Sequence, residues 1–377
     1  MAPKTTALIL AHFHPRVGYK LTFSRSDPTL SLSLAEIEYK LFPSGLHAVP
    51  SDVIYFSHAD QIGVAVFQQR KSGASQRGAE FSSLGVLIPR TAGGDLWKYI
   101  PKLRELVDGE EEELEGFWGT CTLKDSLEDP TPEAENPRKR FGALVRLLGE
   151  RVFMLLRFVM QGKRVLILDG PPVKRGGEVC FLLGSLAGTG RCLFSVGVRD
   201  IPLLEGEGGY VATTTDGILA EKRGLFDYLV EVIGENRVRV KGRDGREVKV
   251  GKRDWEKWSM LKGEGGILGE SSDKIEGHFR DLRETFLRKL ERMVEDRYSD
   301  EDTPRVVVIG ADQIRALGLD PSAEMDREFV VDMVRIHLGK NGVVQSGRRR
   351  SRKVRVCGVV LGISLSVIAI LIYVNYC

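Results

Sequence analysis

Cysteine is scarce in this 377-residue chain, and its five copies are scattered along it. No two of them form a Cys-x-x-Cys pair, which argues against a disulfide framework and against the usual zinc-binding spacing. The chain also lacks the Gly-x-Ser-x-Gly elbow of many hydrolases and the His-Glu-x-x-His helix of many metalloproteases. We therefore expect no catalytic residues, no bound metal and no cofactor.

Three short stretches come closest to a chemical site, and each has a simpler interpretation. Residues 184–190, GSLAGTG, lack the Lys-Ser/Thr end of a phosphate-binding loop, so they favour a helix C-cap followed by a turn. His12 and His14 share one face of a predicted strand, but no cysteine or acid completes a metal site. The acidic residues around Asp200 lie in a glycine-rich loop, where we expect solvated carboxylates.

Long apolar runs are also missing, with one exception near the last residues. The stretch from Val356 to Val374 contains no charged residue, and as a helix it would be roughly 28 Å long, close to the hydrocarbon thickness of a bilayer. At the other end, residues 7–11 form an apolar run of only five residues, which is too short for a signal peptide. We predict a single C-terminal transmembrane helix at residues 356–374.

Basic residues directly precede this predicted span. They are Arg348, Arg349, Arg350, Arg352, Lys353 and Arg355. By the positive-inside rule they place the preceding chain in the cytosol. The sequence thus predicts a tail-anchored, single-pass protein of the endomembrane system, with its body in the cytosol.

The basic segment, residues 346–355, is expected to attract anionic lipid headgroups; a nuclear signal or a nucleic-acid patch is the alternative. Without its six basic residues, the net charge of +3 becomes −3 for the rest of the chain, so we expect no nucleic-acid partner. Cys357, at the membrane edge, is a candidate for S-palmitoylation, the alternative being a small residue within a helix.

The first 107 residues are predicted to form a small sheet with helical cover. Strand-like runs separated by proline, glycine and aspartate occur at 7–13, 17–23, 52–58, 62–70 and 81–89. Residues 95–107 then carry apolar side chains at helical spacing, with Pro101 near a first turn. Residues 108–140 are rich in acids and prolines and are predicted to be a solvated linker.

Residues 141–258 alternate between predicted helices and buried strands, which indicates a three-layer α/β module with a mainly parallel sheet. Residues 259–345 are predicted to form a more helical part. It contains a long amphipathic helix with an apolar stripe, which predicts a packing face rather than a cofactor site. The stripe consists of Ile275, Phe279, Leu282, Phe286, Leu290 and Met293.

Two regions of the chain are similar to a known family. The runs LFPSGLHAVPSDVIYFSH and IGVAVFQQR, and later FSVGVRDIPLL and YVATTTDGILAEKRGLFDYLVEV, resemble the small LCHN-type branch of the DENN-domain proteins, including its fungal relatives. The likeness covers most of residues 7–258. It implies a longin-like N-terminal module, a linker and a central α/β DENN module with a smaller helical part behind it.

The resemblance implies a function in vesicle trafficking. Many DENN proteins are guanine-nucleotide exchange factors for Rab-type small GTPases, an activity that needs a shaped surface rather than a nucleophile. The GTPase would sit on a face shared by the two modules, and the candidate contacts are Thr213, Thr214, Thr215 and Asp216. The alternative for this stretch is an Asp-Gly turn that opens a helix.

A second functional hypothesis fits the same features. The chain could be a non-catalytic DENN scaffold that recruits a GTPase or a trafficking partner to an organelle surface. Release of labelled GDP from a panel of Rab proteins would separate the two hypotheses. The identity of the GTPase, the organelle and the oligomeric state stay open at this point.

Overall fold

The structure is a computed structural model that divides into two units, residues 1–283 and 284–377. It describes residues 5–14, 16–28, 33–34, 36–43, 45–71, 79–90, 95–123, 132, 135–188, 191–234, 237–295 and 306–345. No helix within these ranges combines the length and apolar character needed to cross a bilayer. The predicted span at 356–374, the basic segment at 346–355 and Cys357 lie outside the described residues.

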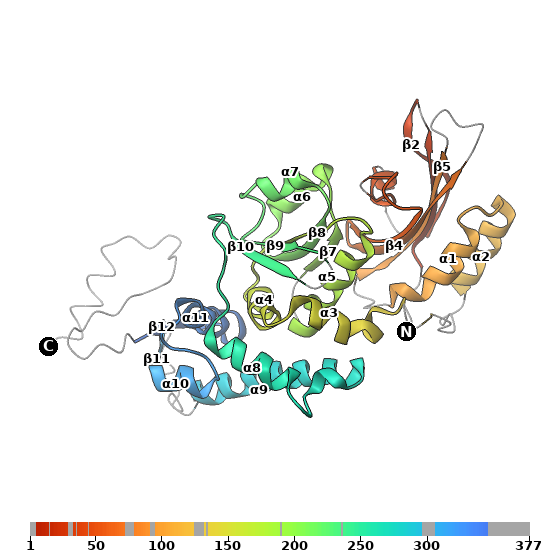
Figure 1. The fold of residues 1–377 in the computed structure, drawn as a ribbon. Coiled ribbons are helices and arrows are strands. Elements are labelled where there is room, and N and C mark those ends of the chain that lie inside the picture. Colours follow the sequence, from red (N-terminus) through yellow and green to blue (C-terminus); the bar gives the residue numbers. More distant parts are fainter. Residues whose placement is uncertain are drawn as a thin grey trace. The chain divides into compact units, whose positions relative to one another are not determined.

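The first unit is a mixed α/β structure built on one ten-stranded sheet, with strands in the order β10-β9-β6-β8-β7-β3-β4-β5-β1-β2 (Figure 1). Its first five strands in sequence are β1 (Ala7–His14), β2 (Gly18–Ser26), β3 (Ser51–His58), β4 (Gln61–Lys71) and β5 (Ala79–Pro89). The other five are β6 (Val165–Leu168), β7 (Arg191–Ser195), β8 (Tyr210–Thr214), β9 (Tyr228–Val232) and β10 (Val238–Gly242).

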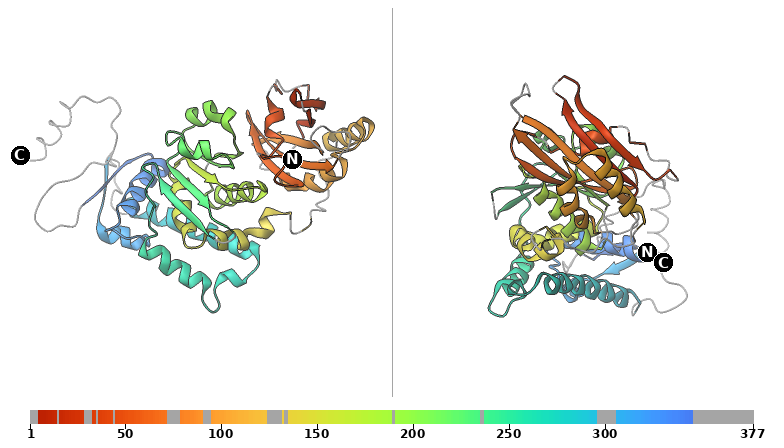
Figure 2. Two further views of the ribbon diagram at one scale, coloured as in Figure 1. Left: turned by 45° about the horizontal axis from the view of Figure 1, so that its top comes forward. Right: turned by 90° about the vertical axis from the view of Figure 1, so that its right-hand side faces the viewer.

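The N-terminal half of the sheet is antiparallel throughout, and its five strands confirm the predicted ones. The edge strand β2 is exposed or half-buried at all but one of its residues, whereas β3, β4 and β5 are buried over most of their lengths because both of their faces are covered. One face packs against the short helix η1 (Ile37–Lys40), and the other carries η3 (Leu96–Tyr99) and α1 (Ile100–Leu106) (Figure 2). Pro101 lies in the first turn of α1, as predicted.

The structure differs from the predicted linker at residues 108–140. Its acidic part is a helix, α2 (Glu111–Leu123), which exposes its glutamates and buries Leu114, Phe117 and Cys121. These three residues recur every three or four positions, so they fall on one helix face, and the surrounding charges hid this pattern. Residues 124–131 lie outside the described part of the chain.

The central half of the sheet is parallel from β7 through β8 and β6 to β9, while β10 runs antiparallel at the edge. Helix α5 (Lys174–Ala187) covers one face, and α6 (Ile201–Gly206) and α7 (Gly217–Glu221) cover the other (Figure 1). From β6 to β7 the chain moves along the sheet toward the N-terminal half, and from β7 through β8 to β9 it moves in the opposite direction. Right-handed crossovers therefore require helices on opposite faces, which produces three layers.

Glycines end the helices on the α5 side. The predicted long apolar helix is split into α3 (Phe141–Leu148) and α4 (Arg151–Met160) at Gly149, which has a φ of 59°. Helix α5 ends at Gly188, a left-handed residue whose N–H donates to the carbonyl of Gly184. This confirms the C-cap predicted for residues 184–190.

The first unit also contains α8 (Lys252–Lys262), the short helix η6 (Ile267–Gly269) and the first part of α9 (Ser272–Glu295). Of the predicted stripe on α9, Ile275 and Phe279 are buried in this unit, but Leu282 is 41% exposed, which differs from its expected place on a packing face.

The second unit begins within α9 and contains α10 (Ala311–Ala316), α11 (Glu324–Leu338) and a two-stranded parallel sheet of β11 (Val306–Ile309) and β12 (Asn341–Val344). From α9 it buries Leu290, and Phe286 packs against Phe329 of α11. The predicted helical part, 259–345, thus also holds a small sheet.

Candidate functional site

The two halves of the sheet in the first unit meet at a seam between β3 and β7. The strands pair at a single position, Phe56 with Phe194. Phe194 has a φ of 57°, unusual for a bulky residue, and the register of β7 shifts next to it. Because one pair of residues cannot hold two sheets together, side-chain contacts must supply most of the connection.

One such contact places a carboxylate of the N-terminal half at the start of α5. Asp52 Oδ2 accepts a hydrogen bond from the backbone N–H of Val173 at 2.7 Å, and Oδ1 accepts from that of Lys174 at 3.3 Å. The first backbone N–H groups of a helix lack intrahelical partners, so Asp52 serves as a cap supplied from another element. Burial raises the pKa of Asp52, and the hydrogen bonds from backbone N–H groups partly offset this shift.

A half-buried ion pair also joins the two halves. Lys40 Nζ, on η1, lies 2.6 Å from Asp200 Oδ1 and donates to the carbonyl of Ser57 at 2.8 Å. The second oxygen of Asp200 accepts from the backbone N–H of Gly197 at 2.9 Å. Asp200 is therefore not the solvated loop carboxylate that the sequence predicted, because Lys40 approaches it from a segment 160 residues away.

An exposed surface lies beside this ion pair, where η1 meets η5 (Val198–Asp200). The Arg199 guanidinium lies 3.5 Å from the ring centroid of Tyr39, and its Nη1 is 3.3 Å from Glu36 Oε1. Val198 is 47% exposed next to them. We call these four residues, Glu36, Tyr39, Val198 and Arg199, the η1–η5 surface. It combines an aromatic ring, an aliphatic side chain and both signs of charge.

The predicted contact residues lie at the end of β8, which neighbours β7. Thr213 and Thr214 are 3% and 2% exposed, so both are buried, and Thr213 lies beneath Gly176 of α5. The Oγ1 of Thr215 is also buried, without a hydrogen-bond partner in the described part of the chain. Asp216 caps α7 by accepting from the backbone N–H of Ile218 at 2.9 Å, which is the predicted turn that opens a helix.

Ile218 is the exposed apolar residue at this strand end, with 56% of its surface accessible. Parallel strands end at the same edge of a sheet, so the segments that follow β7 and β8 leave on one side. GTPase contact by Thr213 to Asp216 stays a prediction, and in this structure Ile218 is more accessible than the three threonines.

Sequence reasoning did not identify the η1–η5 surface. Its members come from segments about 160 residues apart, and the local signal was the quoted run that contains Val198 and Arg199. The side chains of this surface suit the binding of another protein rather than the catalysis of a bond cleavage. Across the described ranges, no three His, Cys, Asp or Glu side chains are grouped so that they could hold a metal ion.

Comparison with known proteins identifies the family. The family model described as DENN domain-containing protein 11 matches residues 8–140 and 119–241. The chain is 27% identical over 374 residues to DENN domain-containing protein 11 of Xenopus laevis, covering 88% of this chain and 83% of the relative. It is 26% identical over 376 residues to the Mus musculus protein of the same name, covering 88% and 80%.

Fungal proteins are similar as well. Uncharacterized protein C119.16c of Schizosaccharomyces pombe is 25% identical over 285 residues, which covers 59% of this chain and 62% of the relative. The family match spans both halves of the ten-stranded sheet, including the strands that form the seam. The chain therefore belongs to the DENN domain-containing protein 11 family.

Proposed function

We propose that this protein is a guanine-nucleotide exchange factor for a Rab-type small GTPase in vesicle trafficking, and that the GTPase docks on the η1–η5 surface and the neighbouring end of β8. Membership of a DENN family carries the proposal, because DENN domains generally bind Rab GTPases and promote their nucleotide exchange. On this interpretation the N-terminal half is the longin-like module, the central half is the DENN module, and the protein is of the small LCHN type.

The geometry supports a docking role for this surface. Arg199 and Glu36 present opposite charges beside the apolar Val198, a mixture typical of interfaces that form and dissociate. Lys40 and Asp200 fix η1 against η5 directly beneath, so residues from both modules are held in one arrangement. A preorganised surface loses less conformational entropy on binding.

Exchange requires no nucleophile, only a difference in affinity. A protein that binds the nucleotide-free GTPase more tightly than the loaded form must, by linkage, weaken nucleotide binding by the same factor. The role of the η1–η5 surface would be to hold the switch segments of the GTPase away from their nucleotide-bound positions.

The predicted span at 356–374 would tether this activity to an organelle membrane, with the basic residues at 348–355 near anionic headgroups. A Rab protein held on the same membrane by its lipid would then meet the exchange factor at an effective concentration of roughly the millimolar scale. Tethering would raise the rate of encounter without changing the chemistry. Cys357 would be available for S-palmitoylation at the membrane edge.

The experiment is release of labelled GDP from a panel of liposome-bound Rab proteins by the full-length protein in liposomes. We expect one Rab to respond, and Arg199→Glu to slow its release at least about tenfold, because a reversed charge at an interface costs several kcal/mol. Arg246→Glu is the control, since the Arg246 side chain is 89% exposed and far along the chain from this surface. Circular dichroism would show that both variants are folded.

Equal release by Arg199→Glu and the wild-type protein would remove the η1–η5 surface from the proposal. If no Rab responded but one bound the full-length protein, the alternative of a non-catalytic scaffold would take its place.

A further inference from the structure

A cavity of about 450 Å³ lies on the α5 side of the seam, between the N-terminal strands β3 to β5 and the central elements α5 and β7. Four aromatic side chains line it, from Tyr55, Trp97, Phe181 and Phe194. Its volume is within the range of small-molecule sites, roughly 300 to 1,000 Å³. We call it the seam cavity. It is on the opposite face of the sheet from the ion pair of Lys40 and Asp200.

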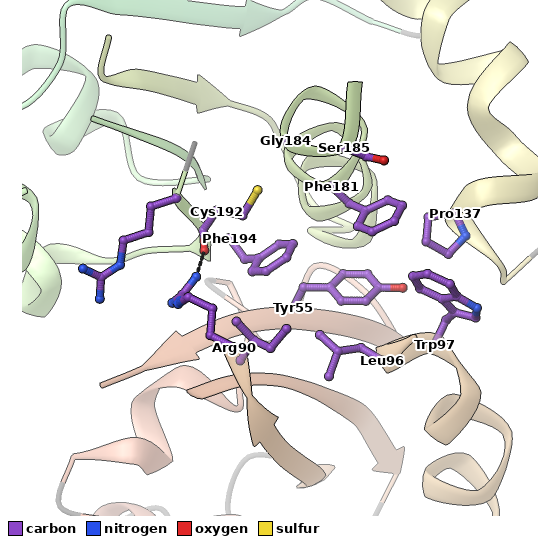
Figure 3. Close-up of a pocket in the computed structure, with 12 residues that line it drawn as sticks. Tyr55, Arg90, Leu96, Trp97, Pro137, Phe181, Gly184, Ser185, Cys192 and Phe194 are labelled. Atoms are coloured by element: carbon purple, nitrogen blue, oxygen red, sulfur yellow. Dashed lines mark hydrogen bonds between the residues drawn. The ribbon is translucent and has the colours of Figure 1, made fainter. Parts of the chain in front are cut away.

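One end of the seam cavity is cationic. Arg90 Nη1 donates to the backbone carbonyl of Cys192 at 2.7 Å (Figure 3), which leaves Nε and Nη2 buried without a hydrogen-bond partner among the described residues. Burial lowers the pKa of Arg90, and the neighbouring charge of Arg191 lowers it further. The carboxylates of Glu207 and Asp60 act in the opposite direction, but neither accepts a hydrogen bond from Arg90.

The two unpartnered nitrogens of Arg90 define the group that would fit. Nε and Nη2 lie on one edge of a guanidinium and donate in parallel, which matches the two oxygens of a carboxylate. A buried donor without a partner is costly, because folding removes its water without replacing the hydrogen bond. The free edge of Arg90 thus favours a bound anion over an empty site.

The other end of the seam cavity is aromatic and carries one further unpartnered polar atom. Tyr55 is 4% exposed, and its hydroxyl has no hydrogen-bond partner within the described ranges. In Figure 3 its ring lies between Phe181 and Leu96, and its hydroxyl points toward Trp97, away from Arg90. The Trp97 and Phe181 rings are 5.1 Å apart in an edge-to-face arrangement. Such walls suit a flat aromatic ring.

We propose that the seam cavity binds a small hydroxyaryl carboxylate, with its carboxylate on Nε and Nη2 of Arg90, its ring among Tyr55, Trp97 and Phe181, and its hydroxyl on that of Tyr55. Such a ligand touches both modules. It would therefore stabilise their joined arrangement by mass action, since it binds only where the seam is formed. The inference is independent of GTPase exchange.

The test uses the fluorescence of Trp97 in the full-length protein held in a lipid nanodisc. The probe is a bromohydroxyphenyl propanoate, whose bromine quenches a tryptophan that it touches. We expect saturable quenching by the carboxylate and binding at least about tenfold weaker by its uncharged amide, because hydrogen bonds to a charged group contribute about 1.5–3 kcal/mol each. Trp97→Phe should abolish the saturable part, which separates Trp97 from the other tryptophans.

Two variants locate the ligand. Arg90→Gln should weaken binding about tenfold to a hundredfold, while Arg246→Gln, at an exposed arginine, should leave it unchanged. If Arg90→Gln does not fold, Ser185→Phe decides instead, since Ser185 lines the cavity and a phenyl ring there fills it. Absence of saturable quenching in the wild-type protein, equal binding of the amide, or unchanged binding to Ser185→Phe would overturn the proposal.

Discussion

The seam between the two halves of the sheet and the interior of the central module use the same kind of interaction in different surroundings. At the seam, the side chains of Lys40 and Asp200 are 16% and 12% exposed. Between α4 and α8, the side chains of Arg157 and Asp254 are 7% and 2% exposed, and two hydrogen bonds of 2.8 and 2.6 Å join them. Both are ion pairs, but only the second is almost completely removed from water.

This difference in burial sets what each pair contributes. Water screens an exposed charge whether or not its partner is present, so breaking an exposed pair costs little. A buried charge that loses its partner has no water to replace it. The seam should therefore tolerate changes better than the contact of α8 with α4, and four substitutions test this expectation.

The largest effect is expected at Asp254. Asp254→Ala leaves the buried Arg157 guanidinium without this carboxylate and should lower the free energy of unfolding by about 3–5 kcal/mol. Urea unfolding of the full-length protein, followed by tryptophan fluorescence, measures it. The double variant Arg157→Met with Asp254→Leu should recover most of the loss, because it buries no charge. A loss below about 1 kcal/mol for Asp254→Ala would mean that water reaches the pair.

The next effect concerns packing at the seam. A Cβ atom at Gly177 of α5 would lie 2.7 Å from Tyr55 Cδ2, so Gly177→Ala should destabilise the protein by about 1–3 kcal/mol through overpacking. The matched control is Gly116→Ala on α2, where a Cβ would meet no atom within 4 Å. That change should instead stabilise by about 0.5–1 kcal/mol, because alanine favours the helix. The same urea experiment measures the free energy of unfolding of both variants. If both free energies changed in the same direction, the packing argument would be contradicted.

A smaller effect is expected at the ion pair of the seam. Lys40→Met should cost about 1–2 kcal/mol, between the values for exposed and buried pairs, because Asp200 is only partly solvated. The matched control is Lys274→Met, whose pair with Glu270 has side chains 64% and 47% exposed. We expect a change within about 0.5 kcal/mol there. Chemical unfolding of both variants in parallel compares them, and equal losses would show that burial does not distinguish the pairs.

The smallest effect is a pH dependence at Asp52. Burial raises its pKa above the ordinary value of 3.8, so the folded state holds this proton more tightly than the unfolded chain. The resulting stabilisation is present at low pH and is lost as the pH rises through the raised pKa. Asp52→Asn removes this titration, and its stability should fall less than that of the wild-type protein from about pH 4 to about pH 7. If the free energy of unfolding changed with pH equally in the wild-type protein and in Asp52→Asn, Asp52 would not be the source of the pH dependence.

Much of the fold could be predicted from local patterns. The strands at residues 7–13 and 62–70 could be predicted from runs of apolar residues bounded by turns. The helix C-cap within residues 184–190 could be predicted from the preference of such caps for glycine. These signals are contained within a few neighbouring residues. The helix at 111–123 was missed because four consecutive glutamates, 110–113, dominate a stretch whose apolar residues are few.

The candidate site could be predicted only in part. The stretch 213–216 was found by its resemblance to DENN proteins, but its sequence does not reveal that Thr213 packs beneath α5, where Gly176 leaves room for it. No sequence pattern marked Arg90 or Tyr55 as a ligand-binding residue. Each becomes a candidate ligand-binding residue because of an unpartnered buried atom, and partners are a property of the folded chain.

By itself the sequence determined the five strands of the N-terminal half, the alternation of helix and strand at the start of the central half, and the resemblance to the DENN family. Those properties depend on side-chain periodicity and on local backbone preferences. Only the tertiary structure decided that β3 lies beside β7, that Lys40 meets Asp200, and that Arg90 keeps one edge free at a cavity. Pairings between segments more than a hundred residues apart depend on the packing of the whole sheet and its helices. No short stretch of sequence contains enough information to predict that packing.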